Sequence, residues 1–245
     1  ALQQQVHVCT PRSVVQLSAA LAEGGDPESF RDHLMPAVRS FLFDFSQRDI
    51  CVIAESFCRV QAADADFLGD LAHSLQPKVG SMGPHEVSVA LNVFAPVSYI
   101  APQLLPLVAG RAHTLAEELG PRQLARTLQG LSVSGCGEPG VFAALARRAS
   151  DLAHVIYGTH AVNMLLALVE AGQLTGPTLD VLLGAISRSL DRMAAPDCVV
   201  TLYTLSRLPE DLRGRAPRGL PEELLRALRR RGFGAWRLDL EAVSH

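Results

Sequence analysis

Lysine is almost absent from this chain of 245 residues, because 21 of its 22 basic side chains are arginine and only Lys78 is lysine. Aromatic residues make up only 5% of the sequence, while leucine and alanine are abundant. Strands favour aromatic and β-branched side chains, so this composition argues against a β-rich fold and favours close-packed helices. The hydrophobic fraction of 48% is large enough for a core and excludes low-complexity disorder over most of the chain.

Paired cysteines are also missing. The sequence has an odd number of cysteines, scattered and without a C-x-x-C pair: Cys9, Cys51, Cys58, Cys136 and Cys198. A disulfide framework or a zinc module would show paired, closer spacing. We therefore expect reduced thiols in core positions, in the cytosol or in the matrix of an organelle.

Long apolar runs and catalytic signatures are lacking as well. No run reaches the length of a membrane span, so no membrane insertion is expected. The sequence holds no G-x-S-x-G, P-loop, S-x-x-K or H-E-x-x-H pattern. Residues 135–140 match G-x-G-x-x-G, but a helical pattern precedes them, whereas a dinucleotide site needs a strand there. We interpret the match as a turn and expect a non-enzyme without metal, cofactor or small-molecule substrate.

What the sequence does contain is a period of 37 residues. Similar segments begin near residues 46, 83, 120, 157 and 194, each 37 after the last, and near residue 10, one step of 36 earlier. Apolar residues then align at offsets of four and three, which places them on one helical face. The aligned sets are Ile50, Val87, Leu124, Ala161 and Cys198; Ala54, Leu91, Leu128, Leu165 and Leu202; and Phe57, Phe94, Leu131, Leu168 and Leu205.

These apolar sets define the first helix of each 37-residue repeat. A second amphipathic helix follows in each repeat after a short loop that contains Gly or Pro, for example over residues 142–153. One helical hairpin cannot bury both of its faces, so neighbouring units must stack. The pattern predicts an all-α fold, a right-handed α-solenoid of tandem two-helix repeats over residues 1–206. Residues 207–245 are expected to form an Arg-rich loop, a terminal helix from Leu220 or Pro221 to about Arg231, and a tail with Trp236 that complete the last unit.

Charge is concentrated near the C-terminal end. Residues 207–237 hold nine arginines against four acids, whereas residues 1–206 hold 13 basic and 19 acidic residues. An Arg-rich end can contact phosphates, although helix-end charge on a solvated surface explains it equally well. Polar residues opposite the core columns of the first helices can meet RNA, water or another protein. The RNA-binding candidates are Arg122, Arg126, Gln129, Arg147, Arg148, His160, Asn163, Arg213, Arg215, Arg218, Arg226, Arg229, Arg230 and Arg231.

The amino-acid sequence of each 37-residue repeat resembles a known class of helical repeats. Residues 124–131 (LARTLQGL) and 142–149 (FAALARRA) are similar to the heptatricopeptide-type repeats of organellar RNA-associated proteins, relatives of the octotricopeptide and pentatricopeptide arrays. The resemblance covers about residues 10–205. The chain lacks the Pro-Pro-Pro-Glu-Trp signature of octotricopeptide repeats and a recognisable RNA-processing domain.

The resemblance implies a non-catalytic protein of the mitochondrial matrix, with plastid or cytoplasm as alternatives. Such a protein would bind or stabilise RNA, for example as a lineage-specific ribosomal subunit that contacts rRNA and neighbouring proteins. The alternative is a purely protein-binding scaffold, such as an assembly factor or accessory subunit of an organellar complex. Pairing of the arginines in residues 207–237 with acids would favour the scaffold. Their alignment with Arg122, Arg126, Arg147 and Arg148 would favour RNA.

Overall fold

A computed structural model describes residues 10–231, which form helices and turns without any β-strand. The expected all-α class is thereby confirmed for this part of the chain. Cys9, Trp236 and the tail after Arg231 lie outside the described residues. The chain divides into two compact units, which we call unit 1 and unit 2, with the boundary between Glu118 and Leu119.

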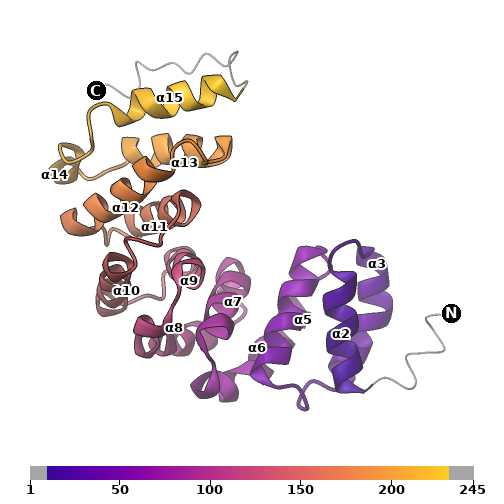
Figure 1. The fold of residues 1–245 in the computed structure, drawn as a ribbon. Coiled ribbons are helices and arrows are strands. Elements are labelled where there is room, and N and C mark those ends of the chain that lie inside the picture. The colour runs from indigo at the N-terminus through magenta and orange to yellow at the C-terminus, as the bar shows by residue number, and fades with distance from the viewer. Residues whose placement is uncertain (1–9, 232–245) are drawn as a thin grey trace. The chain divides into compact units, whose positions relative to one another are not determined.

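Unit 1 contains short helices with several tight turns between them (Figure 1). Its elements are α2 (Pro11–Leu21), α3 (Pro27–Ser29), the π-helical turn η2 (Phe30–Leu34), α4 (Met35–Ser40), α5 (Gln47–Arg59), α6 (Ala65–Leu75), the 3-10 turn η3 (Gln76–Ser81), α7 (Pro84–Phe94), η4 (Ala95–Val97), α8 (Leu104–Thr114) and η5 (Ala116–Glu118).

Unit 2 is more regular, with helices of 11 to 14 residues apart from one short turn of helix. Its elements are α9 (Pro121–Ser134), α10 (Pro139–Asp151), α11 (Gly158–Glu170), α12 (Gly176–Ser189), α13 (Ala195–Ser206), α14 (Glu210–Arg213) and α15 (Leu220–Arg230).

The first helices begin at a fixed interval. Helices α5, α7, α9, α11 and α13 each start 37 residues after the one before. In unit 1, α5 packs against α7 and α6 against α8, while in unit 2 α11 packs against both α9 and α13, and α10 against α12. Within each unit, first helices therefore contact first helices and second helices contact second helices.

Local sequence explains where these helices begin. Ser46 and Asp49 form a reciprocal capping box at the start of α5, and the Asp64 carboxylate accepts a hydrogen bond from the Phe67 amide at the start of α6. Proline occupies the first position of α7, α9 and α10, where its missing amide hydrogen costs nothing. Each start is thus encoded within four residues.

Prolines interrupt the helices of unit 1. The 3-10 turns at Gln76–Ser81 and Ala95–Val97 contain Pro77 and Pro96, and α8 begins only at Leu104, after Pro102. Proline has no amide hydrogen to donate, so a regular helix cannot continue through it.

The segment after α13 differs in part from the prediction. Residues 206–219 were expected to be a loop, but Glu210–Arg213 forms the short helix α14, whose Leu212 is buried. Two acids in its first turn and Arg213 in its last match the helix dipole, and this local order was overlooked. The terminal helix α15 runs over Leu220–Arg230, as expected.

The cysteines are only partly in the core. Cys51 and Cys198 are buried, whereas Cys58 and Cys136 are partly exposed, so the expectation of core positions was wrong for these two. Cys58 follows the buried Phe57 by one residue, which turns it about 100° around the helix, and Cys136 lies in a turn. Burial raises the pKa of the Cys51 thiol to about 12, so this thiol stays protonated.

The glycine-rich match is a turn between helices. Gly135 has a φ of 65°, the left-handed conformation that ends α9, and residues 135–138 then lead into α10. No strand precedes it, which confirms the interpretation as a turn.

Candidate functional site

Five of the RNA-binding candidates lie on two neighbouring first helices of unit 2. Arg122, Arg126 and Gln129 occupy successive turns of α9, while His160 and Asn163 lie on α11, which packs against α9. Burial lowers the pKa of His160, and the positive charge of Arg122 lowers it further. The structure therefore brings Arg122 near His160, whose neutral form is favoured. The buried His160 Nδ1 has no hydrogen-bond partner within residues 10–231.

Two nominated arginines near the C-terminal end pair with acids. The Arg215 guanidinium binds the Asp180 carboxylate, with 2.6 Å between Nη2 and Oδ2, and this contact lowers the pKa of Asp180. Arg230 lies 3.6 Å from the Asp191 carboxylate. All four side chains are largely exposed, so these pairs contribute little to stability, but they neutralise part of the basic end.

Basic side chains in or directly after the second helices donate to backbone carbonyls of the linkers before the first helices. Arg148 Nε lies 3.0 Å from the Leu119 oxygen, and Arg111 Nε lies 2.9 Å from the Met82 oxygen, so both partners recur after 37 residues. Related contacts join Lys78 to Phe45, Arg188 to Ala153 and Arg231 to Leu190. Each linker thus receives a cationic donor for one of its carbonyls.

These contacts give several nominated arginines a structural role. Arg148 and Arg231 hold linkers, and Arg213 Nε donates to the Leu208 oxygen at 3.0 Å. The nominated arginines without a hydrogen bond or ion pair among the described residues are exposed: Arg122, Arg147, Arg218, Arg226 and Arg229. The charges of these five arginines are not neutralised by contacts among the described residues and are available to an external partner.

Replacing Arg148 with alanine is expected to lower the free energy of unfolding by about 1–2 kcal/mol, because the Leu119 carbonyl loses its cationic donor. Arg147 is the matched control, since it is the adjacent residue of α10 and is exposed. Its replacement by alanine should change stability by less than about 0.5 kcal/mol. Urea denaturation followed by circular dichroism measures both, and equal effects of the two substitutions would exclude the structural role of Arg148.

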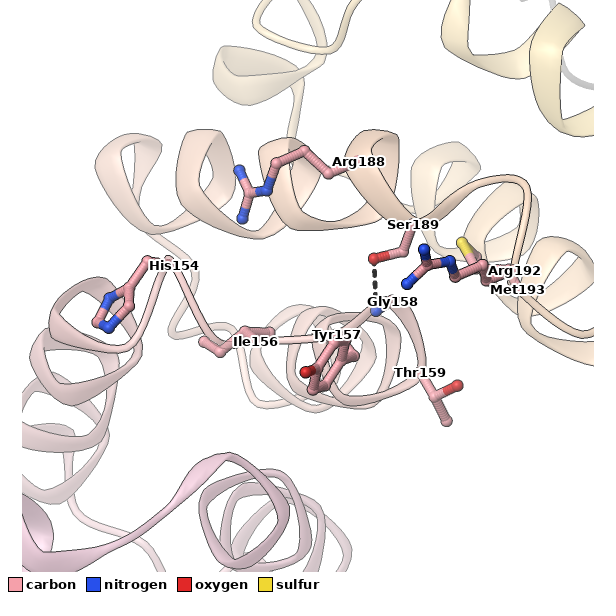
Figure 2. A pocket seen from close by; sticks show the side chains of 9 residues that line it. All are labelled: His154, Ile156, Tyr157, Gly158, Thr159, Arg188, Ser189, Arg192 and Met193. Atoms are coloured by element: carbon pink, nitrogen blue, oxygen red, sulfur yellow. Dashed lines mark hydrogen bonds between the residues drawn. The ribbon is translucent and has the colours of Figure 1, made fainter.

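A cavity of about 210 Å³ lies at the start of α11 (Figure 2). Its walls come from the linker before α11, the first residues of α11, and the segment from the end of α12 to Met193. The lining residues are His154, Ile156, Tyr157, Gly158, Thr159, Arg188, Ser189, Arg192 and Met193. Ser189 Oγ accepts a hydrogen bond from the Gly158 amide at 3.0 Å, which ties the start of α11 to α12. None of these residues is among the RNA-binding candidates predicted from the sequence.

The two units carry opposite charge. Residues 10–118 hold seven basic and 13 acidic side chains, a net charge of −6, whereas residues 119–231 hold 14 basic and ten acidic side chains, a net charge of +4. A charge count over residues 1–206 combines the acidic unit 1 with the neutral residues 119–206 of unit 2. The acidic balance of residues 1–206 belongs entirely to unit 1.

Metal-binding clusters and membrane-spanning helices are the next features to consider in the described residues. Within residues 10–231, no three or more His, Cys, Asp or Glu side chains gather in a group that could hold a metal ion. None of the described helices combines the length and hydropathy that crossing a bilayer requires. Comparison of the sequence with models of known protein families and with curated proteins finds no match.

Proposed function

We propose that this chain is a right-handed α-solenoid of two-helix repeats. The recurrence of first helices at intervals of 37 residues supports this architecture. Helix packing within the units supports it too, since a helix of one repeat contacts its counterpart in the next. The terminal helix α15 buries Leu220, Leu224 and Leu228 and exposes charged residues, as the last helix of such an array must.

The proposed function is non-catalytic binding of single-stranded RNA by unit 2. The observation that carries it is the charge difference, because only unit 2 has an excess of basic residues and these include exposed arginines. Lys and Arg that neutralise phosphates supply most of the affinity of RNA-binding proteins for the backbone. The mitochondrial matrix and a role beside rRNA are part of the proposal and are supported by the resemblance to organellar repeat proteins.

Neutralising exposed arginines in α15 and just before it is expected to weaken RNA binding and its dependence on salt. Arg218, Arg226 and Arg229 are exposed; replacing all three with glutamine should lower the slope of log K against log salt by about 2, since each phosphate contact on a single strand contributes about 0.7. Fluorescence anisotropy of a labelled oligouridylate, titrated between about 50 and 200 mM salt, measures this slope.

The matched control replaces three exposed arginines of unit 1, Arg12, Arg48 and Arg59, with glutamine. It removes the same charge from the acidic unit and should leave the slope unchanged. Absence of binding by the unmodified protein, together with absence of RNA after purification from its native source, would refute the proposed function. Equal slopes for the two triple variants would assign RNA to another surface.

A protein-binding scaffold is the second candidate, and two observations favour it. Pairing of Arg215 with Asp180 and of Arg230 with Asp191 reduces the charge available to phosphates. Unit 1 is acidic and exposes two large aromatic residues, Phe43 at 79% and Tyr99 at 76%, as protein-binding surfaces often do. If this function holds, protein partners will co-purify after nuclease treatment and high salt, and Phe43→Ala or Tyr99→Ala will release them.

A further inference from the structure

The cavity at the start of α11 is lined by basic side chains and by no acidic ones. Its nine lining residues include two arginines and one histidine but no aspartate or glutamate. Figure 2 shows Arg188 on α12 with its guanidinium turned toward the His154 end, and Arg192, which follows α12, with its guanidinium beside Gly158 at the other end. A hollow with cationic walls and no carboxylate is suited to an anionic ligand.

The two arginines differ in the contacts that their side chains make. Arg188 Nη2 donates to the Ala153 carbonyl at 2.6 Å, so this guanidinium is fixed in place. Arg192 is exposed, and its side chain has no hydrogen bond or ion pair with any residue that the structure describes. A planar guanidinium can bind two phosphate oxygens at once. Arg192 is therefore the side chain that a phosphate would bind first, with Arg188 as a fixed second charge in the lining.

Backbone amides at the start of α11 add to the positive potential of the two arginines. The first turn of α11 contains no acidic residue and has no side-chain cap, so the amides of Thr159 and His160 remain available beside the arginines. The Asp197 carboxylate, which lies outside the lining, accepts a hydrogen bond from Thr159 Oγ1 at 2.8 Å. The positive character of the cavity is thus not cancelled from within its walls.

Tyr157 supplies a different kind of surface. Tyr157 is 67% exposed, although its neighbours Ile156 and Gly158 are buried. An exposed aromatic ring beside cationic groups is the arrangement on which proteins stack the bases of single strands. The cavity volume of about 210 Å³ is below the roughly 300–1,000 Å³ of pockets that enclose a whole small molecule. A whole nucleotide is therefore not enclosed by the cavity, and a base would lie outside it on the ring.

We propose that this cavity binds one nucleotide of a single-stranded RNA, with the phosphate on Arg192, the base stacked on Tyr157, and Arg188 as a second positive charge in the lining. The proposal rests on the proposed function of unit 2 and assigns it a defined binding site. It uses residues of the linker and of the second helix α12, which the sequence analysis did not nominate, and does not require the exposed arginines of α15.

The test measures anisotropy of a labelled oligouridylate with three single variants of the full chain. Arg192→Gln should weaken binding about tenfold and lower the salt slope by about 0.7, because one phosphate contact is lost. Tyr157→Ala should weaken binding about tenfold without changing the salt slope, because stacking involves no counterion release. Tyr157→Phe should bind like the unmodified protein, since the ring is retained.

Arg12→Gln in α2 is the charge-matched control and should leave affinity and slope unchanged. Arg192 and Tyr157 are exposed, so their variants should keep the helical circular dichroism and melting temperature of the unmodified protein. If the unmodified protein binds RNA but Arg192→Gln and Tyr157→Ala match Arg12→Gln, the cavity is not the site, while the proposed function stands. If the unmodified protein does not bind RNA at all, both proposals fail.

Competition by uridine monophosphate and by inorganic phosphate identifies the chemistry of the ligand. The nucleotide should displace the oligouridylate from the cavity at lower concentration than phosphate does, because only the nucleotide offers a base to Tyr157. Equal competition by the two would contradict the stacking part of the proposal and reduce the cavity to an anion site.

Discussion

Replacing Leu165 with aspartate is expected to unfold unit 2. Leu165 is fully buried near the middle of α11, the helix that packs against α9, α12 and α13. A carboxylate there would lose its hydration without gaining an ionic partner, and the surrounding helices would lose the contacts of the leucine. The expected loss exceeds about 4 kcal/mol, which is a large fraction of the stability of an ordinary domain.

The pH dependence of this loss has a defined sign. Apolar surroundings raise the pKa of the introduced carboxyl in the folded state above its value in the unfolded chain. Protonation therefore favours the folded state, and the difference in stability from the unmodified protein is largest above the raised pKa and shrinks as pH falls through it. Urea denaturation at several pH values, with both proteins compared at each, measures this difference.

Leu166→Asp provides the control on the same helix. Leu166 is only partly buried, so the same change there leaves the carboxylate in contact with water. Its cost should be well below that of Leu165→Asp, and nearly independent of pH. Similar losses for the two substitutions would contradict the burial assigned to α11.

The helical fold was predictable because its signals are local. Capping by Ser46 and Asp64, and proline at the start of α7 and α9, lie within one turn of the helix ends that they set. The apolar columns needed only the offsets of three and four residues. The short helix α14 was missed because Pro209 and Gly214 on either side of it favoured a loop.

The candidate site was less predictable because it depends on distances between segments. The sequence gives Arg147 and Arg148 the same charge, but only Arg148 reaches a linker carbonyl, 29 residues earlier in the chain. The cavity combines Tyr157 with Arg192, which lie on different elements, and its signal in the sequence is weak. The basic excess of unit 2 lies entirely in residues 207–231, which the charge count already separates, whereas the neutral balance of residues 119–206 becomes visible only once the boundary at residue 118 is known.

Replacing Phe57 with alanine is expected to lower the free energy of unfolding by about 3–5 kcal/mol. Phe57 of α5 is fully buried, and its ring lies between two others, with centroids 4.9 Å from Phe30 of η2 and 4.5 Å from Phe67 of α6. One side chain thus joins three elements of unit 1. Truncation removes both ring contacts, each worth about 0.5–1.5 kcal/mol beyond the buried area, and leaves a cavity.

Two further variants serve as controls. Phe57→Leu separates the ring contacts from hydrophobic burial, and Phe43→Ala measures the effect of losing an exposed phenylalanine. Phe57→Leu keeps most of the volume and should lose only about 1–2 kcal/mol, while Phe43→Ala should lose less than about 0.5 kcal/mol because Phe43 is 79% exposed. Denaturation monitored by circular dichroism ranks the three. If Phe57→Ala costs no more than Phe43→Ala, the aromatic cluster does not hold α5 against η2 and α6. If Phe57→Leu costs as much as Phe57→Ala, the ring geometry and not the buried volume determines the stability of this contact.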